Sequence, residues 1–323
     1  MEKKTDVTAL GELLIDFTDS GLSSQGNPIL EANPGGAPCN VLSMLSRLGK
    51  KTSFIGKVGN DGFGHMLAGA IEEQGINSEG LCFDDEVHTT LALVLKKENG
   101  DRDFSFYRNP GADNHLNESE VRTDLIEESR IFHFGSLSLT DECVRKATEK
   151  AVDVAKKSDC LISFDPNLRE PLWKSLDDAH REIAWGLSVC DVLKISDNEI
   201  IWFTGKEDYD EGVSFLQEQY PNIRMICLSL GADGSRIYKD GKRVEVPAFL
   251  QKETIETTGA GDTFCACILN MILENGLDHL DEESIKKGLA FANAAASIVT
   301  TRKGALRVMP GKEEVESFLV ARQ

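Results

Sequence analysis

Residues 257–262 combine small side chains with one carboxylate, and a small and apolar run, residues 263–273, follows them. Because Gly259, Ala260 and Gly261 stand where a helix is expected to begin, their N–H groups can face an anion, assisted by the helix dipole. The carboxylate of Asp262 lies beside them as a proton acceptor. An anion cradle next to a base is what phosphoryl transfer to a hydroxyl requires. In this hexapeptide alone, a helix cap at Asp262 and a glycine turn explain the same residues equally well.

Short apolar strands alternate with amphipathic helices along almost the whole chain, which is typical of a mainly parallel sheet covered by helices on both faces. Strands are expected at residues 7–17, 52–58, 130–134, 161–165, 192–195 and 225–230. The clearest helix is residues 37–48, where Val41, Leu45 and Leu48 share one face and Gly49 provides the stop. The pattern predicts a doubly wound α/β fold and a single domain over residues 1–323.

Two stretches with a different pattern are expected to form a small β lid, at approximately residues 17–34 and 88–112. Residues 90–97 and 102–108 alternate with period two around Asn99-Gly100, a strong hairpin turn. Residues 19–34 are expected to be a loop rich in Ser, Gly and Asn. Such a flap is well placed to close over a substrate and exclude water, and an edge hairpin without function is the alternative.

Composition and charge argue against nucleic-acid binding and membrane association. The 323 residues carry a formal net charge of −19, which opposes binding to nucleic acid and to anionic membranes. Apolar residues make up 41% and no apolar run is long enough to span a membrane, so a globular protein is expected. The first residues lead into a strand pattern rather than a signal peptide, which favours a cytoplasmic location.

Several familiar site motifs are absent from the sequence. The eight cysteines include no Cys-x-x-Cys, so buried thiols are expected rather than a zinc site or disulfides. Neither a P-loop motif nor a strand followed by Gly-x-Gly-x-x-Gly occurs, which disfavours P-loop nucleotide binding and a dinucleotide-dependent dehydrogenase. Kinase chemistry would therefore need another scaffold.

Two segments resemble the signatures of the ribokinase or PfkB carbohydrate-kinase family. They are residues 33–41, Asn-Pro-Gly-Gly-Ala-Pro-Cys-Asn-Val, and residues 256–262, Glu-Thr-Thr-Gly-Ala-Gly-Asp. Further segments look like the fructokinase branch, in the same order along the chain: residues 11–17, 54–64, 106–113, 132–139 and 165–169. The resemblance implies a ribokinase-like core with a small β lid. It also implies transfer of the γ-phosphoryl of ATP to the 6-hydroxyl of D-fructose, giving fructose 6-phosphate and ADP.

The resemblance implies a role for each matching residue. Asp262 would take the proton from the sugar hydroxyl, and Gly259, Ala260 and Gly261 would supply N–H donors to the phosphoryl oxygens. The residues implied in sugar binding are Asp16, Gly36, Asn40, Arg108, Asn167 and Arg169. Simpler explanations exist for these residues, because short polar side chains cap turns and arginines form ion pairs on an acidic surface.

The nucleotide and metal residues are implied in the same way. They are Ser196, Glu199, Ser229, Gly231, Gly234 and Asn293. Glu199 would organise Mg²⁺ through its waters, or it is only a carboxylate at a helix start. Glu256 stands where the family usually has an Asp that helps to bind a monovalent cation, with residues 300–304 completing the loop. The longer side chain leaves K⁺ activation open.

Other functions compatible with these residues share the fold. Aminoimidazole riboside, 2-keto-3-deoxygluconate and ribose are alternative sugars, because lid and pocket shape decide among them. A non-catalytic sugar-binding regulator is a further alternative, which the intact Asp262 disfavours. Small-molecule sugar and ATP are the expected partners, and the resemblance allows a homodimer that pairs through the lid.

Overall fold

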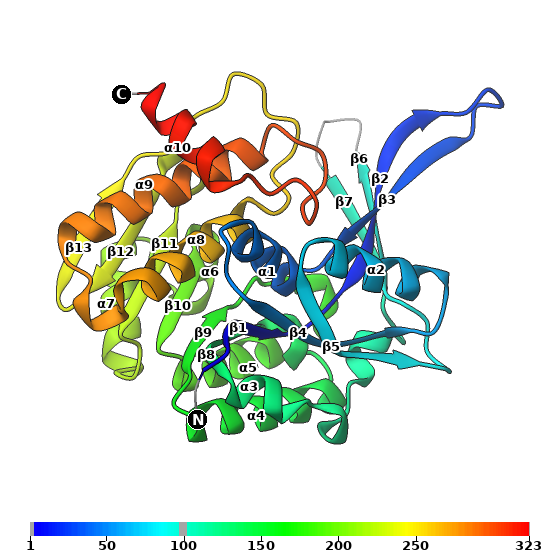
Figure 1. The fold of residues 1–323 in the computed structure, drawn as a ribbon, viewed down its shortest axis with the longest axis horizontal. Helices are drawn as coiled ribbons and strands as arrows, with labels where there is room; N and C mark the ends of the chain where they lie inside the picture. Colours follow the sequence, from blue (N-terminus) through cyan, green and yellow to red (C-terminus); the bar gives the residue numbers. More distant parts are fainter. Residues whose placement is uncertain (1–2, 97–101, 323) are drawn as a thin grey trace.

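Within the residues that the computed structural model describes, 3–96 and 102–322, the core is a nine-stranded sheet (Figure 1). Its strands are β1 (Thr5–Leu10), β4 (Thr52–Gly59), β5 (Ile76–Asp84), β8 (Ser129–Gly135), β9 (Leu161–Asp165), β10 (Val192–Ser196), β11 (Met225–Ser229), β12 (Ser235–Lys239) and β13 (Lys242–Val246). The strand order is β13-β12-β11-β10-β9-β8-β1-β4-β5. The strands from β11 to β5 pair in parallel, whereas β12 and β13 pair antiparallel. Apart from the first, the expected strands are confirmed to within one residue at each end.

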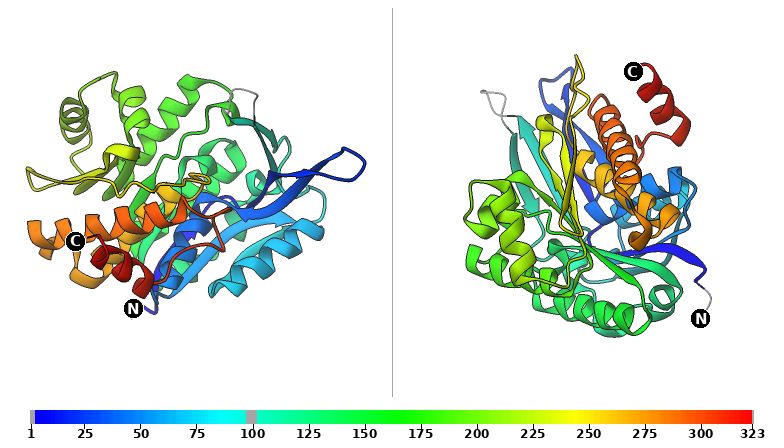
Figure 2. Two further views of the ribbon diagram at one scale, coloured as in Figure 1. Left: turned by 90° about the horizontal axis from the view of Figure 1, so that it is seen from above. Right: turned by 90° about the vertical axis from the view of Figure 1, so that its left-hand side faces the viewer.

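Helices cover both faces of this sheet (Figure 2). One face carries α1 (Ala37–Arg47), α2 (Gly62–Glu73), α8 (Ala260–Asn275), α9 (Glu282–Val299) and α10 (Lys312–Val320). The other carries α3 (Thr123–Glu127), α4 (Glu142–Lys157), α5 (Leu176–Val189), α6 (Asp197–Thr204) and α7 (Tyr209–Gln219). Strand residues alternate between the two apolar clusters, since Ala9 packs on the first face and Leu10 on the second. The predicted doubly wound α/β fold is confirmed.

A second, four-stranded sheet stands apart from the core and forms the lid. Its strands are β2 (Leu14–Leu22), β3 (Pro28–Gly35), β6 (Leu91–Lys96) and β7 (Arg102–Tyr107), in the order β3-β2-β6-β7. The ribbon of β2 and β3 projects beyond the body of the molecule in Figure 1 and in the left-hand view of Figure 2. The antiparallel pair β6 and β7 confirms the predicted hairpin strands, and their Asn99-Gly100 turn lies outside the described residues.

Two expected elements were wrong at the entrance to the lid. Residues 7–17 are not one strand, because β1 ends at Leu10 and β2 begins at Leu14. Between them Gly11 packs so closely on α1 that a Cβ there would lie 2.6 Å from Cγ of Pro38. Glu12 then accepts the N–H of Ala37 at 2.7 Å, which ties the crossing chain to the start of α1. The chain therefore leaves the core sheet at this point and enters the lid.

Residues 19–34 are mostly strand rather than the expected loop. Their Ser, Gly and Asn content reflects exposure, because the tip of the ribbon faces solvent on both sides, with Leu22 70% exposed. A strand without a buried face carries no alternating apolar signal, so its sequence resembles that of a loop.

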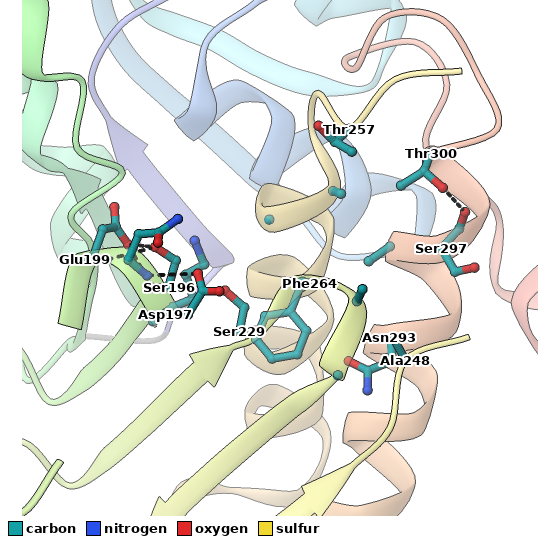
Figure 3. Close-up of a pocket in the computed structure, with 18 of the residues that line it drawn as sticks. Ser196, Asp197, Glu199, Ser229, Ala248, Thr257, Phe264, Asn293, Ser297 and Thr300 are labelled. Atoms are coloured by element: carbon teal, nitrogen blue, oxygen red, sulfur yellow. Dashed lines mark hydrogen bonds between the residues drawn. The ribbon is translucent and has the colours of Figure 1, made fainter. Parts of the chain in front are cut away.

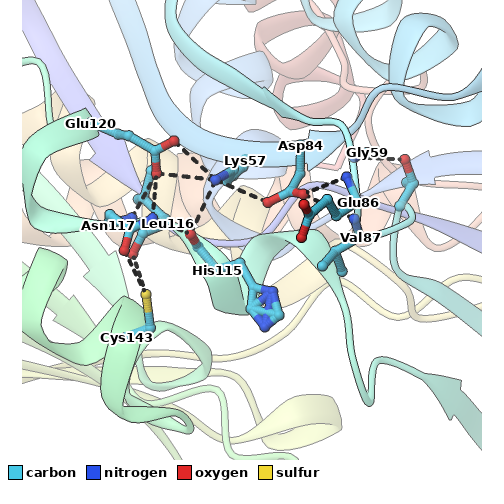
Figure 4. A network of polar contacts seen from close by, with 11 residues as sticks. Lys57, Gly59, Asp84, Glu86, Val87, His115, Leu116, Asn117, Glu120 and Cys143 are labelled. Atoms are coloured by element: carbon cyan, nitrogen blue, oxygen red, sulfur yellow. Dashed lines mark hydrogen bonds and ion pairs between the residues drawn. The ribbon is translucent and has the colours of Figure 1, made fainter.

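A buried lysine anchors the chain where it returns from the lid to the core (Figure 4). Nζ of Lys57, on β4, lies 2.9 Å from Oε1 of Glu120 and 3.0 Å from Oδ2 of Asp84. It also donates to the carbonyl of His115 at 3.2 Å. Because both carboxylates and the carbonyl converge on one ammonium group, the returning segment is fixed to β4 and β5.

Two further sequence expectations concern thiols and membranes. All eight cysteines are free, and six of them are buried, as expected. Of the helices in residues 3–96 and 102–322, none has the length and apolar character needed to cross a membrane.

Candidate active site

Two cavities lie at the carboxyl ends of the parallel strands and meet beside the start of α8. The larger, about 640 Å³, is bounded by β10, β11, α6, α8 and α9, and Figure 3 shows Ser196 and Glu199 on one side of it and Asn293 on the other. The smaller, about 250 Å³, lies between the lid and α1. Five residues line both: Asn167, Arg169, Lys194, Thr257 and Gly261. A ligand in each cavity would therefore have its reacting end at this junction.

The start of α8 is open toward the junction. Gly259 adopts the left-handed conformation with φ of 78°, and among the described residues no side chain caps the helix. The sequence analysis expects the N–H of Ala260 to bind an anion. In the structure this N–H donates to the Thr257 carbonyl at 3.2 Å, in the preceding turn, so it is not free to do so. The N–H groups of Gly259, Gly261 and Asp262 have no acceptor within the described part of the chain. These donors lie at the positive end of the helix dipole, where the sequence predicts an anion cradle.

Asp262 lies beside this cradle and faces the smaller cavity. Its side chain is largely buried, and its Oδ2 accepts a hydrogen bond from Nδ2 of Asn40 at 2.8 Å. Burial raises the pKa of Asp262, although the Asn40 hydrogen bond and the positive charges of Lys194 and Arg169 oppose that shift. A carboxylate with a raised pKa that still reaches the cavity is suited to accept a proton.

The smaller cavity offers unused hydrogen-bond acceptors. Oδ1 of Asn40 is buried and has no hydrogen-bond partner within residues 3–96 and 102–322. Asp16, on β2 of the lid, also lines this cavity. Because buried polar atoms normally have partners, these acceptors indicate a ligand rich in hydroxyl groups.

Asp16 has an unusual acidity. Burial raises its pKa to about 7, and the charges of Glu256 and Asp262 add to the shift while Arg169 opposes it. Between pH 3.8 and about 7 the folded protein therefore binds a proton at Asp16 more tightly than the unfolded chain does. That group stabilises the fold at low pH, and its contribution is lost as the pH rises through about 7.

We expect Asp16→Asn to stabilise the sugar-free protein at pH 8 but not at pH 4. The neutral amide has no charge to bury, so the gain grows between these pH values to on the order of a few kcal/mol. Urea unfolding of both proteins across this range measures the difference. Two stability curves that run parallel with pH would contradict the assigned burial of the charge.

Among the other residues expected to bind sugar, Asn167 and Arg169 reach the cavity and Arg108 does not. Asn167 and Arg169 follow β9 and line both cavities. Arg108 is 5% exposed and its guanidinium is used inside the protein, by Asp113 at 2.6 Å and by Thr140 at 2.9 Å. Asp113 also accepts from the hydroxyl of Thr90, just before β6. Arg108 therefore fixes the base of the lid to the core, because it follows β7 and its partner Asp113 also binds Thr90, which precedes β6.

Gly36 has a backbone role at the start of α1. Its φ of 124° is accessible mainly to glycine, and a Cβ would lie 2.4 Å from the carbonyl oxygen of Glu12. This close approach positions α1, and with it Asn40, against the smaller cavity.

All residues expected at the nucleotide line the larger cavity. They are Ser196, Glu199, Ser229, Gly231, Gly234 and Asn293. Gly234 has a φ of 103° and packs against the Val246 carbonyl, where a Cβ would lie only 2.2 Å from the oxygen. Nδ2 of Asn293 donates to the carbonyls of Val246 and Pro247 at 3.0 and 3.1 Å. Asn293 thus holds the chain segment that forms one wall.

Glu199 forms a capping box at the start of α6. Its Oε2 accepts both the N–H and the hydroxyl of Ser196, each at 2.8 Å, and its Oε1 accepts the N–H of Leu168 at 2.8 Å. Although burial alone would raise it, the charge of Lys194 and these N–H donors lower the pKa of Glu199. The carboxylate is therefore ionised, but both its oxygens are already in use.

Glu256 lies on the loop before α8, against the loop that follows α9. Its Oε1 accepts the N–H of Gly304 at 2.6 Å, and the backbone of Thr300 accepts from Ile255 at 2.8 Å. The side chain is 7% exposed and lines the smaller cavity. The expected proximity of Glu256 to residues 300–304 is thus observed.

Two charged residues of the site were missed by the sequence analysis. Lys194 lines both cavities, and Glu12 lines the smaller one. A signal existed for Lys194, because it is the single charge inside the apolar strand β10. Glu12 has no comparable signal, since its role depends on the crossing from β1 to the lid.

The fold and the site together define a ribokinase-like kinase. The open start of α8 lies where the two cavities meet, the buried Asp262 lies beside it, and the lid covers the smaller cavity. The family model for the pfkB family carbohydrate kinases matches residues 4–311. The chain therefore belongs to the PfkB family of carbohydrate kinases.

Named relatives agree with this family across nearly the whole chain. A probable fructokinase-2 of Arabidopsis thaliana is 41% identical over 98% of this chain and 97% of its own length. The structure of a fructokinase with bound ATP from Xylella fastidiosa matches with a TM-score of 0.90 and 29% identity, covering 99% of both chains. A fructokinase from Vibrio cholerae O395, in a fructose, ADP and calcium ion bound form, matches with a TM-score of 0.86 and 27% identity, covering 98% of this chain and 100% of that one.

Proposed function

We propose that this protein is an ATP-dependent fructokinase, which transfers the γ-phosphoryl group of ATP to the 6-hydroxyl of D-fructose. The observation that carries the proposal is the position of Asp262 and the open start of α8 at the junction of two cavities. The full-length similarity to fructokinases supports the choice of sugar.

The proposed reaction is a direct transfer. The 6-oxygen of fructose forms a bond to the γ-phosphorus while the bond from that phosphorus to the β–γ bridging oxygen breaks. Asp262 takes the hydroxyl proton, and ADP leaves with the bridging oxygen. The N–H groups of Gly259, Gly261 and Asp262 stabilise the charge on the phosphoryl oxygens, and the left-handed conformation of Gly259 opens the helix start.

The sugar is proposed to lie in the smaller cavity. Oδ1 of Asn40 and the carboxylate of Asp16 accept its hydroxyl groups, and Asn167 and Arg169 approach from the core side. Arg108 acts as a positioning residue, because its donors are used by Asp113, Thr140 and the Leu137 carbonyl. The lid strands β2 and β6 close the cavity and exclude water.

The nucleotide is proposed to lie in the larger cavity, together with Mg²⁺. Of the residues that the structure describes, no three His, Cys, Asp or Glu side chains converge to hold a metal ion. Mg²⁺ usually keeps several waters and is held by one or two carboxylates together with substrate phosphates. Glu199 fits only through those waters, since its two oxygens already accept three hydrogen bonds. When bound, Mg²⁺ neutralises charge on the phosphates.

Glu256 is proposed to help hold a monovalent cation beside the anion cradle. We expect turnover in potassium chloride to exceed turnover in tetramethylammonium chloride of equal ionic strength several-fold. Glu256→Gln should reduce that difference, because the amide has no charge to offer the cation. Steady-state rates of both proteins in both salts measure this. Equal rates of the unaltered protein in the two salts would exclude activation by K⁺.

The protein is proposed to act in the cytoplasm. It is also proposed to form a homodimer in which the lids of two copies contact each other. The proposal rests on apolar side chains of the lid strands that face solvent: Leu22, Ile29 and Tyr107 are 70%, 44% and 60% exposed. Sedimentation equilibrium should show a dimer that Leu22→Lys weakens. A monomer at micromolar concentration would contradict the pairing.

The substrate is tested by ADP release with ATP and Mg²⁺ on D-fructose, D-ribose, 2-keto-3-deoxygluconate and aminoimidazole riboside. We expect kcat/KM to be highest for fructose. A higher value for another sugar would replace the substrate and keep the chemistry. No turnover of any of them, with sugar binding retained in calorimetry, would favour a non-catalytic regulator.

A further inference from the structure

Lys194 is a buried cation at the junction of the two cavities. It is the third residue of β10, it is 7% exposed, and its neighbours along the strand are apolar. Its Nζ lies 3.0 Å from Oδ2 and 3.1 Å from Oδ1 of Asp165, at the end of the adjacent strand β9. Although burial alone would lower it, Asp165 and Glu199 raise the pKa of Lys194, so the side chain is charged. A charge in this position needs either a structural or a catalytic reason.

The ammonium group lies directly against the open start of α8. A Cβ placed on Gly261 would lie 3.3 Å from Nζ of Lys194, closer than to any other heavy atom outside its own turn. Lys194 also lines both cavities, together with Gly261. The cation therefore lies beside the open start of α8 at the junction of the two cavities, which is where the two ligands are proposed to meet.

Three carboxylates surround the ammonium group of Lys194. Asp165, Glu199 and Asp262 all interact with Lys194. Arg169 also lines the junction, but its side chain is exposed. Of the three carboxylates, Glu199 lines the larger cavity and Asp262 the smaller. Without Lys194, these two carboxylates would repel an incoming triphosphate, because like charges in a buried site repel strongly. Lys194 lines both cavities as well as pairing with Asp165, so neutralising Asp165 does not account for its position.

We propose that Lys194 is a catalytic residue whose ammonium group contacts the phosphoryl group during transfer, with Asp165 as the residue that positions it. This inference rests on the proposed kinase function. The phosphoryl group carries negative charge on its oxygens throughout the transfer, and a fixed cation stabilises it without reorganisation in a water-poor site. The lysine keeps its proton, because Asp262 is the acceptor of the hydroxyl proton.

The test uses Lys194→Met, which keeps most of the length of the side chain and removes its charge. We expect kcat to fall about 100-fold or more. Affinity for a non-hydrolysable ATP analogue with a γ-phosphate should fall about tenfold, whereas affinity for ADP should change by less than about threefold, as measured by calorimetry with Mg²⁺. A purely structural role predicts equal losses for both nucleotides.

The double variant Lys194→Met with Asp165→Asn separates catalysis from charge balance, because it leaves no unpaired buried carboxylate. We expect it to fold and to remain as slow as the single variant. Recovery of kcat to within about fivefold of the unaltered protein would overturn the proposal. Lys239→Met is the matched control, since Lys239 is also 7% exposed and paired with an aspartate, Asp240, but lines neither cavity. The nucleotide comparison requires no sugar, so it tests Lys194 even if fructose is not the substrate.

Discussion

Asp262→Asn should lower kcat about a thousandfold while ATP still binds. The amide cannot accept the hydroxyl proton, and loss of a general base typically costs ~10²–10⁴ in rate. A thousandfold loss corresponds to about 4 kcal/mol of transition-state stabilisation. The fold should survive, because Nδ2 of Asn40 can donate to an amide oxygen as it does to Oδ2 of Asp262. Steady-state kinetics and calorimetry with ATP measure the two effects.

The control for Asp262→Asn is Glu182→Gln. Glu182 is a carboxylate of the same 8% exposure, on α5, paired with Arg145 and remote from both cavities. Its kcat should stay within about twofold of the unaltered protein, since only the general stability changes. If Asp262→Asn kept near-normal turnover, Asp262 would not be the base.

Gly36→Ala should destabilise the protein by about 3 kcal/mol and lower kcat/KM at least about tenfold. The added Cβ would lie 2.4 Å from the carbonyl oxygen of Glu12 and 3.1 Å from Cα of Leu13, both backbone atoms that cannot rotate away. Relief of this clash requires α1 to shift, and Asn40 on α1 would then lose its distance of 2.8 Å to Asp262. Chemical denaturation and steady-state kinetics measure both consequences.

Gly49→Ala provides the comparison for Gly36→Ala. Gly49 also has a positive φ, 79°, but a Cβ there would meet no atom within 4 Å. It should cost only the left-handed backbone penalty, about 1 kcal/mol, with unchanged kcat/KM. Equal losses for the two variants would show that the close approach to Glu12 does not matter.

The sequence predicts the core of the fold well because its strands are buried. Residues 161–165 form β9 as expected, and the apolar residues of β10 and β11 are found with one-residue differences. Burial on both faces gives these strands continuous apolar runs, which are easy to recognise. The break between β1 and β2 is not visible in this way, because apolar residues continue on both sides of Gly11 and Glu12 while their partners change from the core sheet to the lid.

The site is predictable where a residue acts through its own chemistry or its backbone. Asp262, Asn40, Asp16 and Gly36 all reach the smaller cavity, as their segments suggest. Arg108 differs, because the sequence does not reveal that Asp113 and Thr140 use its guanidinium. Lys194 is visible in the sequence as a charge inside an apolar strand, but its neighbour at the start of α8 becomes known only from the fold.

The most direct test of the proposed function is the NMR spectrum of the product formed from D-fructose and ATP. We expect the phosphorus to couple to two methylene protons that also couple to the proton on carbon 5, which places the new phosphate on the 6-hydroxyl. A phosphate on the methylene group of carbon 1, or no phosphorylated sugar, would contradict the orientation of fructose in the cavity beside Asp262.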